Sequence, residues 1–295
     1  LVGALPSAWY EQVAFNFDEE FPMDLYLQDR DAVWLDQDGD GMFDSHSDLN
    51  LDFYTSRLDG TPAELEEYFA RLEYYRIVGH LVDVLAFVFI DDDWIHVTRT
   101  DAFGLDRLYH TVEISWDPVE TTAEAYVTKL TGGGAEFVYQ WMHSGSEFVQ
   151  EYNVAGSFYN LFNCSAARFD NPNLAQVYTV GTDHGLAILG STKVGSAQGS
   201  RVFHGGLAAG HSWGEAYRLW YNTKGKQNDE WHLGMVIMGD PLLRISPEML
   251  SPSYAEATEW RPPAELDQIM ERIAEDSILS TFEEYQERHP EFFDD

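Results

Sequence analysis

The chain has 295 residues, of which 44% are hydrophobic and 15% are aromatic, a composition typical of a folded globular protein. Its formal net charge of −34 repels nucleic acid and anionic membrane surfaces, so we expect neither as a partner. No apolar stretch approaches the roughly 18 residues that a membrane-spanning helix needs, so membrane insertion is not expected. With one cysteine, the chain cannot form an intramolecular disulfide.

Apolar runs along the chain predict a series of strands. These are Val2–Leu5, Asp24–Trp34, Leu85–Ile90, Phe137–Met142, Phe158–Phe162 and Leu186–Leu189. Several of the runs show little alternation of polar and apolar residues. Such continuous runs are typical of strands that are covered on both faces.

Three helices are predicted between and after these strands. The first begins after Thr61 and runs to about Val78, because Thr61, Pro62 and Glu64 combine a capping box with a proline at the first helical position. Gly79 ends it. The other two helices cover Thr122–Leu130 and a segment from Ser212 or Gly214 to about Tyr221. The alternation of strands and helices predicts an α/β sandwich with a mainly parallel sheet.

The character of the sequence changes after residue 245. Prolines mark a linker at Pro247, Pro252, Pro262 and Pro263. An apolar stripe on a strongly acidic helix follows at Leu266, Ile269, Ile273 and Leu279. We therefore divide the chain into a body, residues 1–245, and a Pro-containing linker with an acidic amphipathic helical tail, residues 246–295.

An acidic segment near the start of the chain has the spacing of a calcium loop. The expected ligands are four carboxylates and one backbone carbonyl, those of Asp36, Asp38, Asp40, Asp44 and Met42. Calcium takes six to eight oxygen ligands, and Gly41 permits the sharp turn that wraps short side chains around one point. Ser47 stands where an EF-hand has its bidentate glutamate. We expect a structural Ca²⁺ that orders the loop; the alternative is an acidic surface turn.

Two of the predicted strands are followed by residues that can do chemistry. Cys164 follows Phe158–Phe162, and His143 follows Phe137–Met142. Parallel strands deliver their C-terminal ends to one edge of a sheet, where α/β folds place their sites, so this thiol and imidazole form a candidate catalytic pair. The alternative is a buried structural cysteine, since free cysteines are often buried.

Three carboxylates follow the predicted strand Leu85–Ile90, and they belong to Asp91, Asp92 and Asp93. If that strand lies beside the two strands just described, one of these acids orients the imidazole or binds a second cation. The alternative is a solvated acidic strand end that has no role in the chemistry.

Ser191, Thr192 and Lys193 follow the predicted strand Leu186–Leu189 at the same edge of the sheet. This position predicts a wall of a substrate-binding site, where small residues let a peptide chain lie close to the protein backbone. The place of the segment after a core strand is what favours this role.

No organic cofactor is expected. The remaining histidines lack the spacing of a zinc site, and the run Gly132–Gly134 is not followed by the lysine and hydroxyl residue of a phosphate-binding loop. Ser144 and Ser146 lack the glycine pattern that surrounds a serine nucleophile.

Several blocks of the body occur in an order that is specific when they are taken together. They are Trp141–Ser146, Phe162–Phe169, Gly190–Lys193 and Met238–Pro241, together with Asp24–Tyr26, Asp36–Gly41 and Ile90–Trp94. In these blocks the chain resembles the gingipain-like cysteine peptidases. The resemblance covers about residues 1–245 and leaves the tail outside. It implies a caspase-haemoglobinase-like, three-layer α/β/α sandwich with a mainly parallel central sheet.

The same resemblance implies a cysteine endopeptidase that hydrolyses peptide bonds through an acyl-thioester, with Cys164 and His143 as the catalytic dyad. The oxyanion would be held by the backbone N–H groups of Cys164 and of Ser144 or Gly145. The family usually has glycine directly after the histidine, whereas this chain has Ser144. The identity of the second donor therefore stays open.

Specificity and location are also implied by the resemblance. Gingipains bind Arg or Lys in an acidic pocket, and Asp101 or Asp106 can supply such a charge here. The resemblance implies a prokaryotic, extracytoplasmic enzyme, secreted or at the cell surface, that acts on a peptide or protein substrate. Two alternatives stay open, namely a catalytically inactive caspase-like calcium-binding module and a self-processing protease that acts only on its own precursor.

Overall fold

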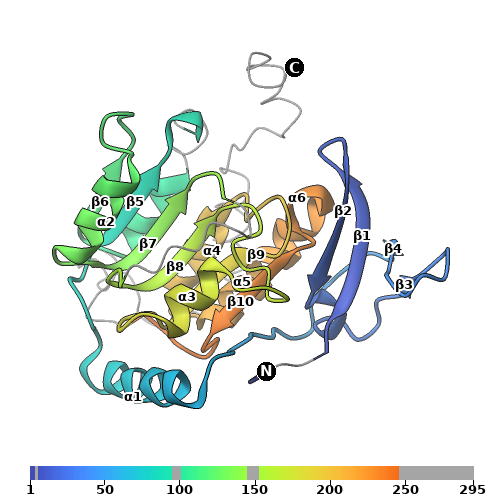
Figure 1. Ribbon diagram of the computed structural model, residues 1–295, viewed down its shortest axis with the longest axis horizontal. Coiled ribbons are helices and arrows are strands. Elements are labelled where there is room, and N and C mark those ends of the chain that lie inside the picture. The colour runs from blue at the N-terminus through green and yellow to red at the C-terminus, as the bar shows by residue number, and fades with distance from the viewer. Residues whose placement is uncertain (4–5, 95–100, 145–152, 246–295) are drawn as a thin grey trace.

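A six-stranded sheet lies at the centre of the part that the computed structural model describes, residues 1–3, 6–94, 101–144 and 153–245 (Figure 1). Its strands are β5 (Ala86–Ile90), β6 (Val112–Ser115), β7 (Ala135–Trp141), β8 (Gly156–Phe162), β9 (Ala187–Ser191) and β10 (Met235–Gly239). They lie in the order β10-β9-β8-β7-β5-β6. All neighbours are parallel except β10, which pairs antiparallel with β9. The expected tail, residues 246–295, lies outside the described residues.

Four of the predicted strands are confirmed as β5, β7, β8 and β9. Every residue of these four strands is buried. A strand that is covered on both faces needs apolar residues at successive positions, which explains why these segments read as continuous apolar runs.

Helices cover both faces of the sheet. The α-helices are α1 (Pro62–Val78), α2 (Ala123–Thr131), α3 (Leu174–Val180), α4 (Ser200–Ala208), α5 (Trp213–Thr223) and α6 (Asp229–His232). Residues of α2 and α3 pack in one core cluster, and residues of α1, α4 and α5 pack in another on the opposite face. The mainly parallel sheet between two helical layers confirms the predicted α/β/α sandwich (Figure 1).

The predicted starts of α1, α2 and α5 are confirmed by their caps. At α1 the Thr61 hydroxyl accepts the Glu64 N–H at 3.3 Å, and the Glu64 carboxylate accepts the Thr61 N–H at 2.7 Å. Gly79 ends α1 with a φ of 89°, the left-handed conformation of many helix C-termini. The N-caps of α2 and α5 are Thr122 and Ser212. α3 and α4 were not predicted.

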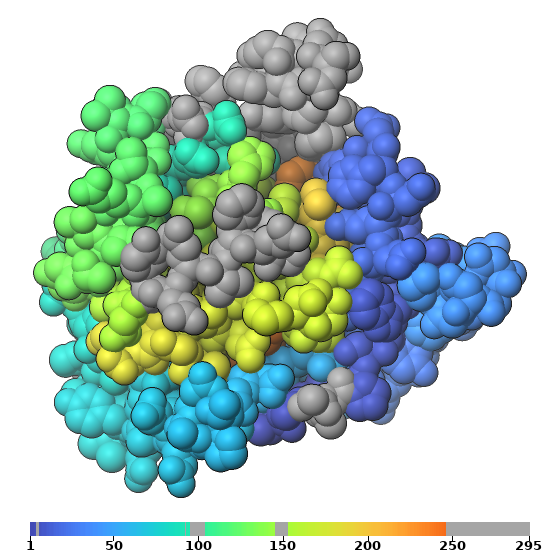
Figure 2. Space-filling model, in the orientation of Figure 1, coloured from blue at the N-terminus to red at the C-terminus, as the bar shows by residue number. Residues whose placement is uncertain are grey.

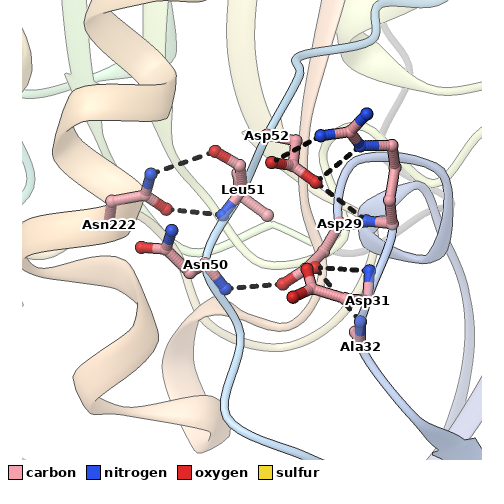
Figure 3. Close-up of polar contacts among 8 residues, drawn as sticks. Asp29, Asp31, Ala32, Asn50, Leu51, Asp52 and Asn222 are labelled. Atoms are coloured by element: carbon pink, nitrogen blue, oxygen red, sulfur yellow. Dashed lines mark hydrogen bonds and ion pairs between the residues drawn. The ribbon is translucent and has the colours of Figure 1, made fainter.

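The strand predicted over Asp24–Trp34 is wrong. The segment instead forms a 3₁₀ helix, Leu25–Leu27, and a turn before the two-residue strand β3 (Trp34–Leu35). One oxygen of the Asp29 carboxylate accepts the N–H groups of Asp31 and Ala32, at 3.3 and 3.2 Å, while the other accepts that of Asn50 at 2.6 Å (Figure 3). These local hydrogen bonds replace a strand ladder.

The neighbouring loop is tied to α5 by a side-chain amide. The Leu51 N–H donates to Asn222 Oδ1 at 2.7 Å, and Asn222 Nδ2 donates to the Leu51 carbonyl at 3.1 Å (Figure 3). The strand expected at Val2–Leu5 appears only as an isolated bridge between Val2 and Leu58, and residues 4 and 5 lie outside the described parts.

An N-terminal hairpin, which was not predicted, stands beside the sheet. It consists of β1 (Ala8–Ala14) and β2 (Phe17–Met23), joined by Phe15 and Asn16, whose φ angles are 52° and 66°. Two positive φ angles are what a tight type I′ hairpin turn requires. The space-filling view places this hairpin, in dark blue, next to the yellow segments that follow β8 and β9 (Figure 2). None of the helices in the described ranges has the length and hydropathy that crossing a bilayer requires.

Candidate functional site

The two candidate catalytic residues leave the sheet at matching positions of neighbouring strands. In the parallel pairing of β7 with β8, Trp141 lies opposite Phe162. His143 and Cys164 each follow that pair by two residues. The rings of Trp141 and Phe162 stack with their centroids 3.6 Å apart and their planes at 10°. Strand register therefore brings the imidazole segment and the thiol segment to the same edge of the sheet.

Hydrogen bonds join these two segments beyond the strands. The Met142 N–H donates to the Phe162 carbonyl at 3.3 Å, and the Ser144 hydroxyl donates to the Cys164 carbonyl at 2.8 Å. The side chain of Ser144, an expected oxyanion residue, thus holds the cysteine loop. The other expected oxyanion residue, Gly145, lies outside the described residues.

The imidazole of His143 has an acidic and an aromatic neighbour. Its Nε2 lies 3.2 Å from Asp93 Oδ2, and its ring centroid lies 5.2 Å from that of Trp94. The side chain of His143 is 59% exposed, so the ring is open to a molecule arriving from solvent. A carboxylate in this position orients an imidazole.

Asp93 is one of the three acids expected to follow β5. The Asp91 N–H donates to the Trp141 carbonyl at 2.9 Å and so extends the pairing of β5 with β7 by one residue. The 3₁₀ turn Asp92–Trp94 begins there, and from it Asp93 reaches the imidazole. The Asp92 side chain lies outside the described atoms.

Cys164 is partly buried and begins a tight turn. The next residue, Ser165, has a φ of 54°, in the left-handed region that residues other than glycine rarely adopt. Burial raises the pKa of the Cys164 thiol, whereas a hydrogen bond from the Gly195 N–H and the charge of Lys193 lower it. Burial is the largest of these effects, so the pKa of the thiol is raised overall, although the donor and the cation both oppose that shift.

The sequence reasoning missed Gly195. This residue has a φ of 118°, and a Cβ atom there would lie 2.6 Å from the Trp231 carbonyl oxygen. Glycine is the residue that fits both requirements. A glycine shortly after the Ser191–Lys193 segment was the available signal, but its close approach to Trp231 arises only when the chain folds.

The side chains of Ser191, Thr192 and Lys193 are all buried. Their backbone also holds neighbouring segments, because the Ser191 carbonyl accepts the Ala167 N–H at 2.9 Å and the Thr192 N–H donates to the Gly234 carbonyl at 2.8 Å. All three residues have 0% of their surface exposed, backbone included. The predicted role of this segment as a substrate-binding wall stays a prediction.

The two acids expected in a specificity pocket lie on a 3₁₀ helix, Asp101–Arg107. This helix packs on α4, because a Cβ atom at Gly104 would lie 3.0 Å from the Cβ of His204. Asp106 is exposed, and the Asp101 side chain lies outside the described atoms. The assignment of these acids to a pocket for Arg or Lys stays a prediction.

The acidic loop folds around its own carboxylates. The Asp36 carboxylate accepts the N–H groups of Gly39 and Gly41, at 2.6 and 3.0 Å, and both glycines have positive φ angles. Carboxylate oxygens of Asp36, Asp38 and Asp44 lie within 4.8 Å of one another. The turn predicted at Gly41 is therefore present, and it gathers the short side chains to one point.

Two observations bear on whether this loop fits a cation. The Asp44 Oδ1 atom is buried without a hydrogen-bond partner among the described residues, and a bound cation would satisfy it. Glu11, on β1, brings an oxygen within 4.8 Å of those of Asp38 and Asp40, a contact that the sequence reasoning missed. An all-oxygen donor set of this kind suits Ca²⁺.

Comparison with known proteins identifies the fold through solved structures. Neither a protein-family model nor a curated protein sequence matches the chain. The crystal structure of the Arg-specific cysteine proteinase gingipain R is 14% identical, with a TM-score of 0.51 over 67% of this chain and 56% of that chain. The complex of RgpB pro- and mature domains from Porphyromonas gingivalis is 15% identical, with a TM-score of 0.50 over 68% and 58%.

A third structure, described only as a protease, is 15% identical with a TM-score of 0.50 over 76% of this chain and 60% of that chain. The chain thus spans less than two thirds of the length of each of these structures. At such identities the likeness establishes the fold. It confirms the gingipain-like, caspase-like fold that the sequence blocks implied.

Proposed function

We propose that this protein is a cysteine endopeptidase in which Cys164 is the nucleophile and His143 is the general acid and base. The observation that carries the proposal is the matched position of the two residues, each two residues past the paired Trp141 and Phe162. The gingipain-like fold supports it, because the solved structures with this fold include cysteine proteinases.

In the proposed reaction, the Cys164 thiolate attacks the carbonyl carbon of the scissile peptide bond. The bond between carbon and nitrogen breaks, and His143 gives a proton to the leaving amine. Water then attacks the acyl-thioester, releasing the new carboxyl group and regenerating the thiol. Backbone N–H groups near Cys164 stabilise the oxyanion in both steps, and Asp93 keeps the imidazole in the orientation needed.

The proposal also covers the substrate and the cellular location. The proposed substrate is a peptide or protein that is cleaved after Arg or Lys, with Asp101 or Asp106 supplying the negative charge of the specificity pocket. An extracytoplasmic location, secreted or at the cell surface, is proposed from the sequence resemblance alone. No nucleic acid is proposed as a partner, because the net charge of −34 repels it.

The deciding experiment compares the protein with its Cys164→Ala variant on peptides that contain Arg or Lys. We expect the variant to lose turnover and labelling by thiol-reactive peptide probes while melting at the temperature of the parent protein. Turnover that survives this substitution would overturn the assignment of the nucleophile. A parent protein that folds but neither cleaves nor reacts with the probe would instead be an inactive binding module. Cleavage confined to its own precursor, detected by intact mass, would make it a self-processing protease.

We also propose that the acidic loop binds a structural Ca²⁺. Its ligands are the carboxylates of the loop and the Met42 carbonyl, with Glu11 as a further oxygen donor, and they comprise Asp36, Asp38, Asp40, Met42, Asp44 and Glu11. The unsatisfied oxygen of Asp44 supports this proposal. Backbone hydrogen bonds link Phe43 to Trp9 and Glu11, so the ion would also brace the N-terminal hairpin.

The calcium proposal is tested by melting the protein with and without a chelator at constant ionic strength. We expect removal of Ca²⁺ to lower the Tm by roughly 5–10 °C, as loss of a ligand held well above its Kd does for a body of this size. The double variant Asp38→Ala, Asp40→Ala should lose this dependence, and the exposed Glu66→Gln should keep it. A Tm that chelation leaves unchanged in the parent protein would contradict the site.

A further inference from the structure

We propose that Lys193 is a positioning residue for Cys164, because its carbonyl holds the turn that carries the thiol and Glu19 of the N-terminal hairpin holds its buried ammonium. The inference rests on the proposed role of Cys164 as the nucleophile. It also makes the N-terminal hairpin a part of the site, since Glu19 lies on β2.

Lys193 is a buried cation directly behind the cysteine turn. Its side chain is 0% exposed, and its carbonyl accepts the Ser165 N–H at 2.8 Å. Its Nζ lies 3.2 Å from the Glu19 carboxylate, and it donates to the Glu230 carbonyl at 2.6 Å and to the Val194 carbonyl. These acceptors offset part of the cost of burying the charge.

The hairpin holds this arrangement through several contacts. The second oxygen of Glu19 accepts the Val194 N–H at 2.6 Å, and the Phe15 N–H donates to Glu230 Oε1 at 2.7 Å. The Lys193 ammonium lies 5.2 Å from the ring centroid of Phe15 and 5.6 Å from that of Phe21, distances at which a cation is attracted to an aromatic face. A hairpin far away in sequence thus encloses a cation beside the candidate nucleophile.

The charged groups around the Cys164 thiol and the Lys193 ammonium come from several elements. Burial has the largest effect on the pKa of the Cys164 thiol and raises it; Lys193 lowers the same pKa, and Glu19 raises it. Burial lowers the pKa of Lys193, while Glu19, Cys164 and Glu230 raise it. His232, on α6, also faces Lys193. His143, the other member of the proposed dyad, lies on the segment after β7.

A purely structural role for Lys193 and Glu19 predicts a different outcome. If Lys193 and Glu19 only brace the loop, removing either one disturbs the site in the same direction, because each leaves the other as an unpaired buried charge. If they set the charge around the thiol, removing the cation disfavours the thiolate and removing the anion favours it. The sign of the two effects separates the roles.

The experiment measures how fast iodoacetamide alkylates Cys164 between pH 5 and pH 9, followed by intact mass. Cys164 is the only cysteine, so every adduct reports on this thiol, and the thiolate is the reacting form. At pH 7 we expect Lys193→Met to slow alkylation about tenfold and Glu19→Gln to accelerate it about threefold. Lys193→Arg, which keeps the charge, should stay within about twofold of the parent protein.

Lys129→Met, on the distant helix α2, is the matched control and should leave the rate unchanged. An unchanged rate in folded Lys193→Met, or slowing by both Lys193→Met and Glu19→Gln, would overturn the inference. If Lys193→Met does not melt cooperatively, Glu19→Gln decides alone. An alkylation rate that does not rise in Glu19→Gln would then overturn the inference. Alkylation needs no peptide turnover, so failure of the peptidase proposal would appear as absent turnover while the charge effects on the thiol remain measurable.

Discussion

β7 carries an ionisable residue near each of its ends, and the two lie in opposite surroundings. Glu136, at the amino end, is fully buried, and its burial raises the pKa of its carboxyl group from 4.5 to about 8. His143, past the carboxyl end, is 59% exposed and faces a carboxylate. One end of the sheet is thus closed and keeps its acid protonated, while the other is open to solvent and to charged partners. Of these two ends of β7, the carboxyl end is the one that is open to the incoming molecule that the proposed proton transfer needs.

The substitution with the largest expected effect on activity is His143→Ala. We expect kcat/KM for a peptide substrate to fall roughly a thousandfold, because a general acid and base contributes about that much. The free energy of unfolding should change little, since the side chain is mostly exposed. Urea denaturation and steady-state kinetics on the same preparation check both statements. A large loss of stability would mean that the carboxyl edge supports the fold in the same way as the amino edge.

The amino end is tested by Glu136→Gln, which removes the proton-binding group. Between pH 4.5 and about 8 the folded protein keeps a proton on Glu136 that the unfolded chain releases. The contribution of Glu136 to the free energy of unfolding is therefore complete below pH 4.5, and it is lost as the pH rises to about 8. Relative to the variant, the parent protein should lose on the order of several kcal/mol of stability from pH 5 to pH 8.

Urea denaturation at a series of pH values measures this difference, with kcat/KM expected to stay unchanged because Glu136 lies far from the carboxyl edge. The exposed Glu66→Gln serves as the control and should follow the parent protein. Parallel stability curves for the parent protein and Glu136→Gln would show that the amino end does not hold a neutral acid.

The smallest effect is expected for Asp93→Asn, which removes the charge facing the imidazole but keeps the size of the side chain. We expect kcat/KM to fall about fivefold, because both partners are exposed and solvent screens their attraction. A loss as large as that of His143→Ala would place Asp93 in the chemistry itself.

Much of the body was predictable because its signals are local. The cap of α1 depends on residues within one turn, and the buried strands that precede His143 and Cys164 consist mostly of apolar residues. The hairpin β1–β2 was missed because its strands carry many charged residues, such as Glu11 and Glu20, which face each other across the pair. The segment Asp24–Trp34 was wrongly predicted to be a strand, because a pattern of apolar residues does not reveal the hydrogen bonds of Asp29.

At the candidate site, the elements that carry His143 and Cys164 were predictable and their surroundings were not. A strand that is followed by a cysteine or a histidine can be recognised from the sequence. Glu19 has no such signal, because its partners Lys193 and Val194 lie far from it in sequence, 175 residues away for Val194, and approach only after the hairpin docks. The burial of Lys193 was equally hidden, since lysine side chains are usually exposed.

The indole of Trp94 lies 5.2 Å from the candidate imidazole and 6.0 Å from Trp141. Protonated imidazole quenches the fluorescence of a neighbouring indole, whereas the neutral ring quenches it weakly. The emission of the parent protein minus that of a Trp94→Phe variant therefore provides an optical titration of His143. This built-in reporter lets the ionisation of the ring be followed without a substrate, an inhibitor or an attached dye.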